Sequence, residues 1–245
     1  VVVSQRAAFA SGTTKNLHLQ WRTFISFCIF FQFEPLPASL STICAYGQFL
    51  SRSFKSVDSV RNYLHGVKVL HVLLGYEFKH LQSIECRLML RGLDRIKLHH
   101  VKQALPITPH TLASIYPFFN FSLPVHIACW AAFLIAFFTM SRKANLVLPS
   151  VSNFDHRKQL SRGDIMVGEH GLLVSFGWSK TNQIGKRNVL IPLLRLENSV
   201  LCPVTAYSKL IDLVPCEDYL PAFSYHLKPK LQCLTSFRFV NILRS

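Results

Sequence analysis

Residues 121–143 read FSLPVHIACWAAFLIAFFTM followed by SRK, and this stretch decides how the rest of the chain is organised. Its first twenty residues contain no Asp, Glu, Lys or Arg. About 20 apolar residues suffice to cross a bilayer, with basic residues at the cytoplasmic end. Pro124 and His126, however, shorten the uninterrupted run to the length typical of a buried core helix. We therefore expect a helix buried on all sides, with a single membrane span as the less favoured alternative.

The residues before this stretch predict helices joined by short loops. Apolar residues recur at helical spacing over about 14–33, 39–51, 56–74 and 81–96. Pro35 and Pro37 stop the first of these helices, and Ser56 caps the third. In the fourth, the pattern predicts that Ile84 and Leu88 face inward.

The residues from about 108 onward predict a different architecture. Thr108 and Pro109 open a helix, as cap and first-turn proline. After Arg142, residues 164–178 read as a β-hairpin, and 188–191 as a third strand ended by Pro192. Helical character returns at 203–212 and near 234. The predicted fold class is mainly α with an α+β second domain that has a small antiparallel sheet, and the expected domains are 1–98 and 108–245, joined by a linker at 99–107.

Composition and charge exclude several classes of protein. Half of the 245 residues are hydrophobic and only 16% are charged, which excludes a disordered tail. The seven cysteines form no C-x-x-C pair, so neither a disulfide framework nor a zinc site is expected, and the adjacent His99 and His100 have no third ligand nearby. The formal net charge of +15 is divided between residues 1–105 (+8) and 106–245 (+7). Such a surplus points first to nucleic acid and second to an anionic membrane.

Rows of cations lie on the polar sides of two expected helices and continue into the linker. Residues at i, i+4 and i+7 or i+8 share one stripe of a helix. A solvated helix face is the plain interpretation of such rows, but the net charge of the first half favours DNA contact. The candidate DNA-binding residues are Arg61, His65, Lys68, Arg87, Arg91, Arg95, Lys97 and Lys102.

The motifs follow one another in an order that is itself informative. Trp21 and Phe24 begin the helical region, and Arg91-Gly92-Leu93 precedes the basic linker. The buried helix is followed by Ser141-Arg142-Lys143, and the hairpin by Ser179-Lys180-Thr181. Cys202-Pro203-Val204 then opens a helix. This order, over nearly the whole chain, resembles the tyrosine recombinases or phage-integrase-like enzymes, and in particular the branch carried by eukaryotic transposable elements.

The resemblance implies a fold, a partner and a chemistry. It implies an N-terminal SAM-like, core-binding helical bundle and a catalytic domain that acts on double-stranded DNA, with possible homo-oligomers on the DNA. The family cuts DNA through a covalent 3′-phosphotyrosyl bond without metal or cofactor. Arg142 would neutralise the scissile phosphate and Lys180 would protonate the leaving 5′ oxygen. Asn145 stands where many members carry Glu; its amide would still accept a hydrogen bond. The expected location is the nucleus, or the cytoplasm for a non-functional remnant.

The remaining residues of the family's active site have no counterpart. None of the 11 histidines is followed three positions later by Arg, and all seven tyrosines precede residue 226. We expect a C-terminally truncated fragment that binds DNA but is inactive alone, because no nucleophile is present. A non-catalytic DNA-binding or regulatory domain would keep the basic rows without using Arg142 and Lys180. On position alone, Arg142 would be a cation capping an apolar helix and Lys180 an exposed turn residue.

Overall fold

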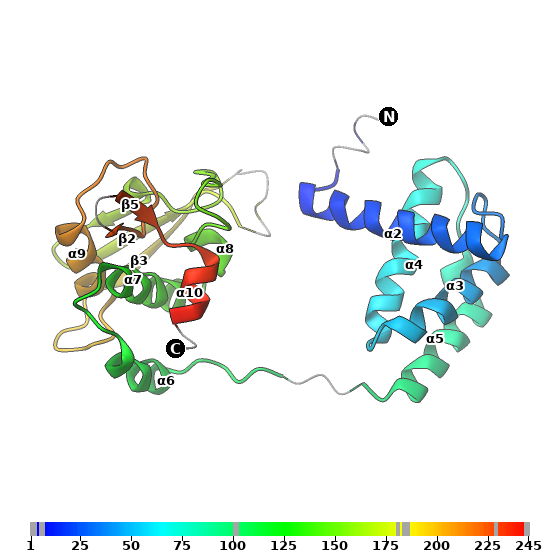
Figure 1. The fold of residues 1–245 in the computed structure, drawn as a ribbon, viewed down its shortest axis with the longest axis horizontal. Coiled ribbons are helices and arrows are strands. Elements are labelled where there is room, and N and C mark those ends of the chain that lie inside the picture. Colours follow the sequence, from blue (N-terminus) through cyan, green and yellow to red (C-terminus); the bar gives the residue numbers. More distant parts are fainter. Residues whose placement is uncertain are drawn as a thin grey trace. The chain divides into compact units, whose positions relative to one another are not determined.

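The computed structural model describes residues 4, 8–99, 103–179, 182, 187–227 and 230–242. The chain divides into two compact units, Val1–Ala104 and Leu105–Ser245 (Figure 1). This division falls inside the segment 99–107 that the sequence marks as a linker. Each unit has a hydrophobic core of its own.

The first unit is a bundle of helices. It contains α2 (Ser11–Phe31), α3 (Leu40–Ser53), α4 (Val57–Leu73), the 3-10 turn η1 (His80–Gln82) and α5 (Ile84–Lys97). The side chains of Ser39, Ser56 and Ser83 each accept a backbone N–H and so cap α3, α4 and α5. Buried residues from several helices, among them Phe24 and Tyr46, meet in its core. The four helices expected from the sequence are thus confirmed, with ends shifted by a few residues.

The expected inward face of α5 is wrong. Ile84 and Leu88 are 62% and 58% exposed, whereas Cys86 and Leu93 are buried. The Ser83 cap starts the helix so that Cys86, Leu90 and Leu93 form the row that faces α3 and α4. The sequence offered two apolar rows on this helix, and packing selects only one of them.

The second unit is built around α7 (Pro124–Thr139), whose side chains from Ile127 to Ile135 are all buried. It packs against α9 (Pro203–Leu213) and against the strands β3 (Val189–Leu194) and β4 (Ser224–Leu227). The described part of this unit also contains the shorter helices α6 (Pro109–Ile115), α8 (Lys143–Leu146) and α10 (Ser236–Ile242). Two 3-10 turns, η2 (Tyr116–Phe118) and η3 (Arg162–Asp164), lie between them. The expected buried helix is confirmed. Among the described residues, no helix has both the length and the apolar character needed to cross a membrane.

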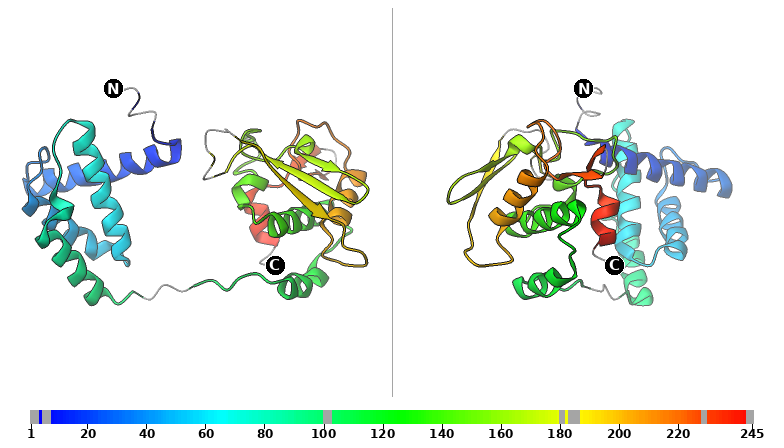
Figure 2. Two further views of the ribbon diagram at one scale, coloured as in Figure 1. Left: turned by 180° about the vertical axis from the view of Figure 1, so that it is seen from behind. Right: turned by 60° about the vertical axis from the view of Figure 1, so that its left-hand side comes forward.

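Two small antiparallel sheets complete the second unit. Strands β1 (Ile165–Val167), β2 (Gly171–Phe176) and β3 (Val189–Leu194) pair in that order, so the expected hairpin and third strand are confirmed (Figure 2). Pro192 does not end β3 as expected: it lies inside the strand opposite Leu173. β3 is at the edge of the described sheet and has no strand on its outer side. The missing N–H of Pro192 therefore removes no inter-strand hydrogen bond on that side.

The sequence did not predict the second sheet. Strands β4 (Ser224–Leu227) and β5 (Lys230–Cys233) pair in antiparallel register, and β4 packs on α7. Neither four-residue segment contains a β-branched residue, and Tyr225 is the one residue with a strong strand preference, so β-propensity gave little signal.

Candidate nucleic-acid interface

Arg142 lies just beyond the buried helix α7. Met140 adopts a left-handed conformation with φ 50°, and the backbone N–H groups of Met140 and Ser141 donate to carbonyls in the last turn of α7. Backbone groups therefore cap the end of α7, which differs from the interpretation of Arg142 as the helix cap. Arg142 is the N-cap residue of the short α8 and is exposed.

A small pocket lies beside Arg142. It has a volume of about 200 Å³ and is lined by α7, α8 and the ends of β2 and β3 that lie next to one another. Phe176 at the end of β2 and Trp178 just beyond it contribute aromatic surface, and Val189 and Ile191 of β3 contribute apolar surface. No Asp or Glu is among the described residues that line this pocket, which we call the Arg142 pocket. A guanidinium without a carboxylate neighbour is suited to binding an anion such as a phosphate.

Lys180 lies outside the described residues, but Ser179 before it and Asn182 after it are joined by hydrogen bonds. The Asn182 N–H donates to the Ser179 hydroxyl over 3.0 Å, and the Asn182 side-chain amide donates to the carbonyls of Gly177 and Arg187. Ser179 and Asn182 both line the Arg142 pocket. The two candidate catalytic positions therefore belong to chain segments that meet at one pocket, although they are 38 positions apart.

Asn145 fixes the distance between these two segments. Its side chain is buried, and its amide donates to the carbonyl of Trp178 over 2.9 Å and to that of Lys158 over 3.4 Å. The sequence led us to expect that this amide would accept a hydrogen bond in place of the family's carboxylate. In the structure its N–H groups donate two hydrogen bonds, one of which joins α8 to Trp178, two residues beyond the end of β2. A carboxylate at this position would not replace these two bonds, because it has no N–H to donate.

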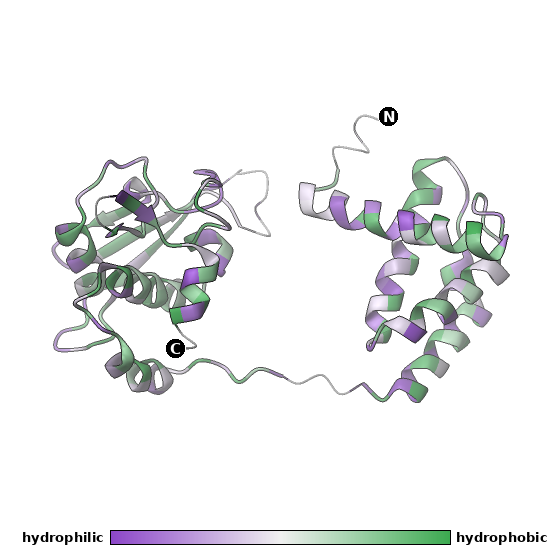
Figure 3. Ribbon diagram, in the orientation of Figure 1, coloured by the Kyte–Doolittle hydropathy of each residue, from purple (hydrophilic) through white to green (hydrophobic). Residues whose placement is uncertain are grey.

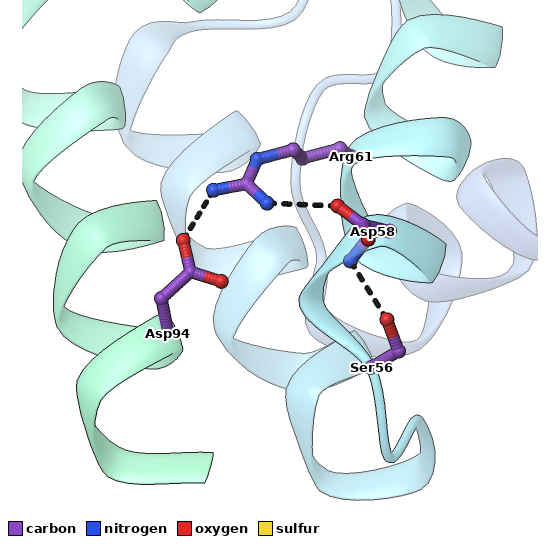
Figure 4. A network of polar contacts seen from close by, with 4 residues as sticks. All are labelled: Ser56, Asp58, Arg61 and Asp94. Atoms are coloured by element: carbon purple, nitrogen blue, oxygen red, sulfur yellow. Dashed lines mark hydrogen bonds and ion pairs between the residues drawn. The ribbon is translucent and has the colours of Figure 1, made fainter. Parts of the chain in front are cut away.

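In the first unit, the arginines of α5 differ from Arg61 of α4. Arg87, Arg91 and Arg95 are exposed, and no described residue forms an ion pair with them. Arg61 instead bridges Asp58 of its own helix, over 2.9 Å, and Asp94 of α5 (Figure 4). The hydrogen bond that Arg61 donates to the Asp94 carboxylate is the main reason that the pKa of Arg61 is raised. The charge of Arg61 is therefore already balanced, and this side chain links α4 to α5.

The other candidate DNA-binding residues differ in exposure. His65 is exposed on α4, and Lys68 and Lys97 are half-buried. Lys102 lies outside the described residues. Three exposed arginines on α5 are thus the densest group of unpaired cations that the sequence predicted in this unit.

Sequence reasoning missed two groups of polar residues in the second unit. The first is a pocket of about 470 Å³ whose lining includes the consecutive residues Asp155, His156, Arg157 and Lys158. Asp155 pairs with Lys158 over 2.8 Å, so this cluster is partly neutralised internally. Four consecutive polar residues in so apolar a chain were the signal that was available.

The second missed group surrounds Arg162, which is buried. Its Nη2 donates to the carbonyl of Ser224 over 3.4 Å, and its guanidinium lies 5.8 Å from the ring centre of Tyr207. These contacts connect η3 with β4 and α9, and we assign Arg162 a structural role. No group of three or more His, Cys, Asp or Glu side chains able to hold a metal ion occurs among the residues that the structure describes.

No protein-family model matches the chain, and no curated protein sequence matches it significantly.

Proposed function

We propose that this chain is a DNA-binding protein of the tyrosine recombinase type, which acts in DNA recombination and integration, and that its 245 residues bind duplex DNA without cleaving it. The observation that carries the proposal is that Arg142, Ser179 and Asn182 line one pocket, and that none of the described residues lining it is an Asp or Glu. A recombinase of this type needs a planar cation and a proton donor at one phosphate.

Three further features support DNA as the partner. Both halves of the chain are basic, and α5 presents Arg87, Arg91 and Arg95 to solvent. The α5 arginines repeat every four residues, so they form one stripe that a phosphate backbone can follow. The proposal includes a SAM-like fold for the first unit and a recombinase-type catalytic fold for the second. It also includes a nuclear location and oligomers that form on DNA.

The experiment compares duplex binding by the chain with binding by the Arg142→Ala and Arg142→Lys variants. A charge-assisted contact to phosphate is worth enough that Arg142→Ala weakens binding about tenfold. Arg142→Lys keeps the charge but loses the two-pronged geometry, and we expect it to lose nearly as much. Arg195→Ala is the matched control, because Arg195 is exposed beyond the opposite end of the β2–β3 pair. Equal losses for Arg142→Ala and Arg195→Ala would contradict the proposal.

A non-catalytic DNA-binding domain is the second candidate function, and the lack of a His-x-x-Arg pair favours it. For that function Arg142 is an ordinary cation, so Lys should replace it fully. Incubation with a nicked duplex tests the second part of the proposal. We expect no covalent protein–DNA adduct after denaturation, and an adduct would show that these residues do cleave DNA.

A further inference from the structure

The C-terminal part of α2, which contacts α3 and is coloured as hydrophobic at its end in Figure 3, carries exposed aromatic side chains. Phe30 is 79% exposed, Leu19 56%, Phe31 45% and Phe49 36%. These four side chains and the buried Phe27 line one groove of about 490 Å³, together with Arg22. We call it the aromatic groove.

The rings of the groove hold one another in place. Phe27 contacts Phe31 and Phe49 with ring centres 5.0 and 5.2 Å apart, and Phe30 lies 4.8 Å from Phe31. Phe27 itself is 4% exposed and belongs to the core, so the floor of the groove is fixed to the bundle. Binding to a surface that is already ordered loses little side-chain entropy.

The local backbone keeps these rings exposed. α2 ends at Phe31, and Gln32 takes a left-handed conformation with φ 57°. The Phe33 N–H then donates to the carbonyl of Cys28 over 2.9 Å, which turns the chain back toward the core. Phe33 is half-buried against the core cluster, whereas Phe30 and Phe31 stay outside.

No Asp or Glu is among the described residues that line the groove, and Glu34, just beyond the end of α2, is not part of the lining. Neither α2 nor α3 contains an Asp or Glu, and together they carry Lys15, Arg22 and Arg52. Arg22 lines the groove itself. A partner should therefore carry carboxylates beside its apolar side chains, and a second copy of this surface would bring basic residues against basic residues.

The size of the groove favours a single helix over a folded partner. The exposed area of the four side chains together equals that of about two fully exposed side chains, on the order of 400 Å² of apolar surface. Stable protein interfaces bury about 800 Å² on each partner, whereas one amphipathic helix can anchor three or four side chains in a groove of this area.

We propose that the aromatic groove binds an acidic amphipathic helix of another protein, with apolar side chains seated among Phe30, Phe31 and Phe49 and a carboxylate facing Arg22. This interaction does not depend on the proposed function, because the residues concerned are on α2 and α3. The DNA-binding candidates of this unit lie on α4, α5 and the linker.

The test uses two synthetic peptides that share Leu and Trp at i, i+3, i+4 and i+7. One carries Glu on its polar face and the other carries Lys. We expect the full chain to bind the Glu peptide at least ten times more tightly than the Lys peptide, measured by fluorescence anisotropy. Phe30→Ser should weaken binding of the Glu peptide about tenfold. Phe118→Ser is the matched control, since Phe118 is 82% exposed but lies in the second unit.

Charge reversal tests the role of Arg22 separately. Arg22→Glu should reduce the preference for the Glu peptide at least tenfold, because it places a carboxylate in the groove. Phe30 and Arg22 are both exposed, so these substitutions leave the core intact, and circular dichroism checks that each variant is folded. Equal binding of the two peptides, binding of neither, or a Phe30-dependent dimer in sedimentation experiments without peptide would each overturn the proposal.

Discussion

The α5 arginines should determine much of the salt dependence of DNA binding, and Arg61 should not. Each phosphate contact that a protein makes contributes about −0.9 to the slope of log K against log salt concentration. Arg87, Arg91 and Arg95 are exposed and have no ion-pair partner among the described residues, so each can make one such contact. Replacing all three with Ala should therefore reduce the slope by about 2.7.

This change is large enough to measure with a labelled duplex and fluorescence anisotropy. Raising the salt concentration from roughly 50 to 200 mM weakens DNA binding by both proteins. With a slope smaller by about 2.7, the factor by which the triple variant loses affinity should be about 40 times smaller than the factor for the unsubstituted chain. Alanine has the highest helix propensity, so the triple variant should keep α5 folded.

The control for this experiment removes a cation whose charge is already balanced. The double substitution Arg61→Ala and Asp94→Ala deletes one positive and one negative charge that pair across α4 and α5. We expect its slope to equal that of the unsubstituted chain. A triple variant with an unchanged slope, or a double variant whose slope falls by about one contact, would refute the reasoning.

Two further predictions concern stability. Asn145→Ala removes the hydrogen bonds to Trp178 and Lys158 and should lower the free energy of unfolding of the second unit by about 1–3 kcal/mol. Asn153→Ala, at an exposed position, is the control and should have little effect. Urea unfolding measures both changes, provided that the m-value is the same for all three proteins. His71 is wholly buried; its Nδ1–H donates to the Val67 carbonyl and its Nε2 accepts the Ala38 N–H. Burial lowers the pKa of His71 below its ordinary value of 6.5, so the unfolded chain binds a proton at a higher pH than the folded chain does. The free energy of unfolding should therefore fall as the pH decreases below about 6.5. His71→Gln should make the unfolding free energy less dependent on pH in this range, and an identical pH profile for both proteins would rule out His71 as the cause.

The sequence predicted the elements of the fold better than their faces. The run from Phe121 to Met140 predicted a buried helix, because α7 is apolar on every side. On α5, by contrast, Ile84 and Leu88 are exposed to solvent, since Cys86, Met89, Leu90 and Leu93 are the apolar side chains of this helix that are buried or half-buried in the bundle. Helical spacing predicts which residues share a face, but the neighbouring helices decide which face is buried.

The sequence predicted that Arg142 and Lys180 act together, and this stays a prediction because Lys180 lies outside the described residues. Ser179 and Asn182, which precede and follow it in the chain, line the Arg142 pocket. The role of Asn145 could not be predicted, because its hydrogen-bond partner is the backbone carbonyl of Trp178, 33 positions away. A backbone carbonyl leaves no trace in residue identity.

Arg61 shows why the number of basic residues overstates how many of them are available to a polyanion. By spacing, Arg61 belongs to a cationic row as regular as that of α5, yet Asp94, 33 residues further on, removes it from the row. The pairing depends on how α4 packs against α5, and no pattern within either helix contains that information. A cation contributes to DNA affinity in proportion to the counterions that it releases, and a guanidinium that already binds two carboxylates has few to release. If the proposed function holds, the net charge of a unit indicates only that its partner is a polyanion, and the unpaired cations should determine the affinity and the helix that contacts it.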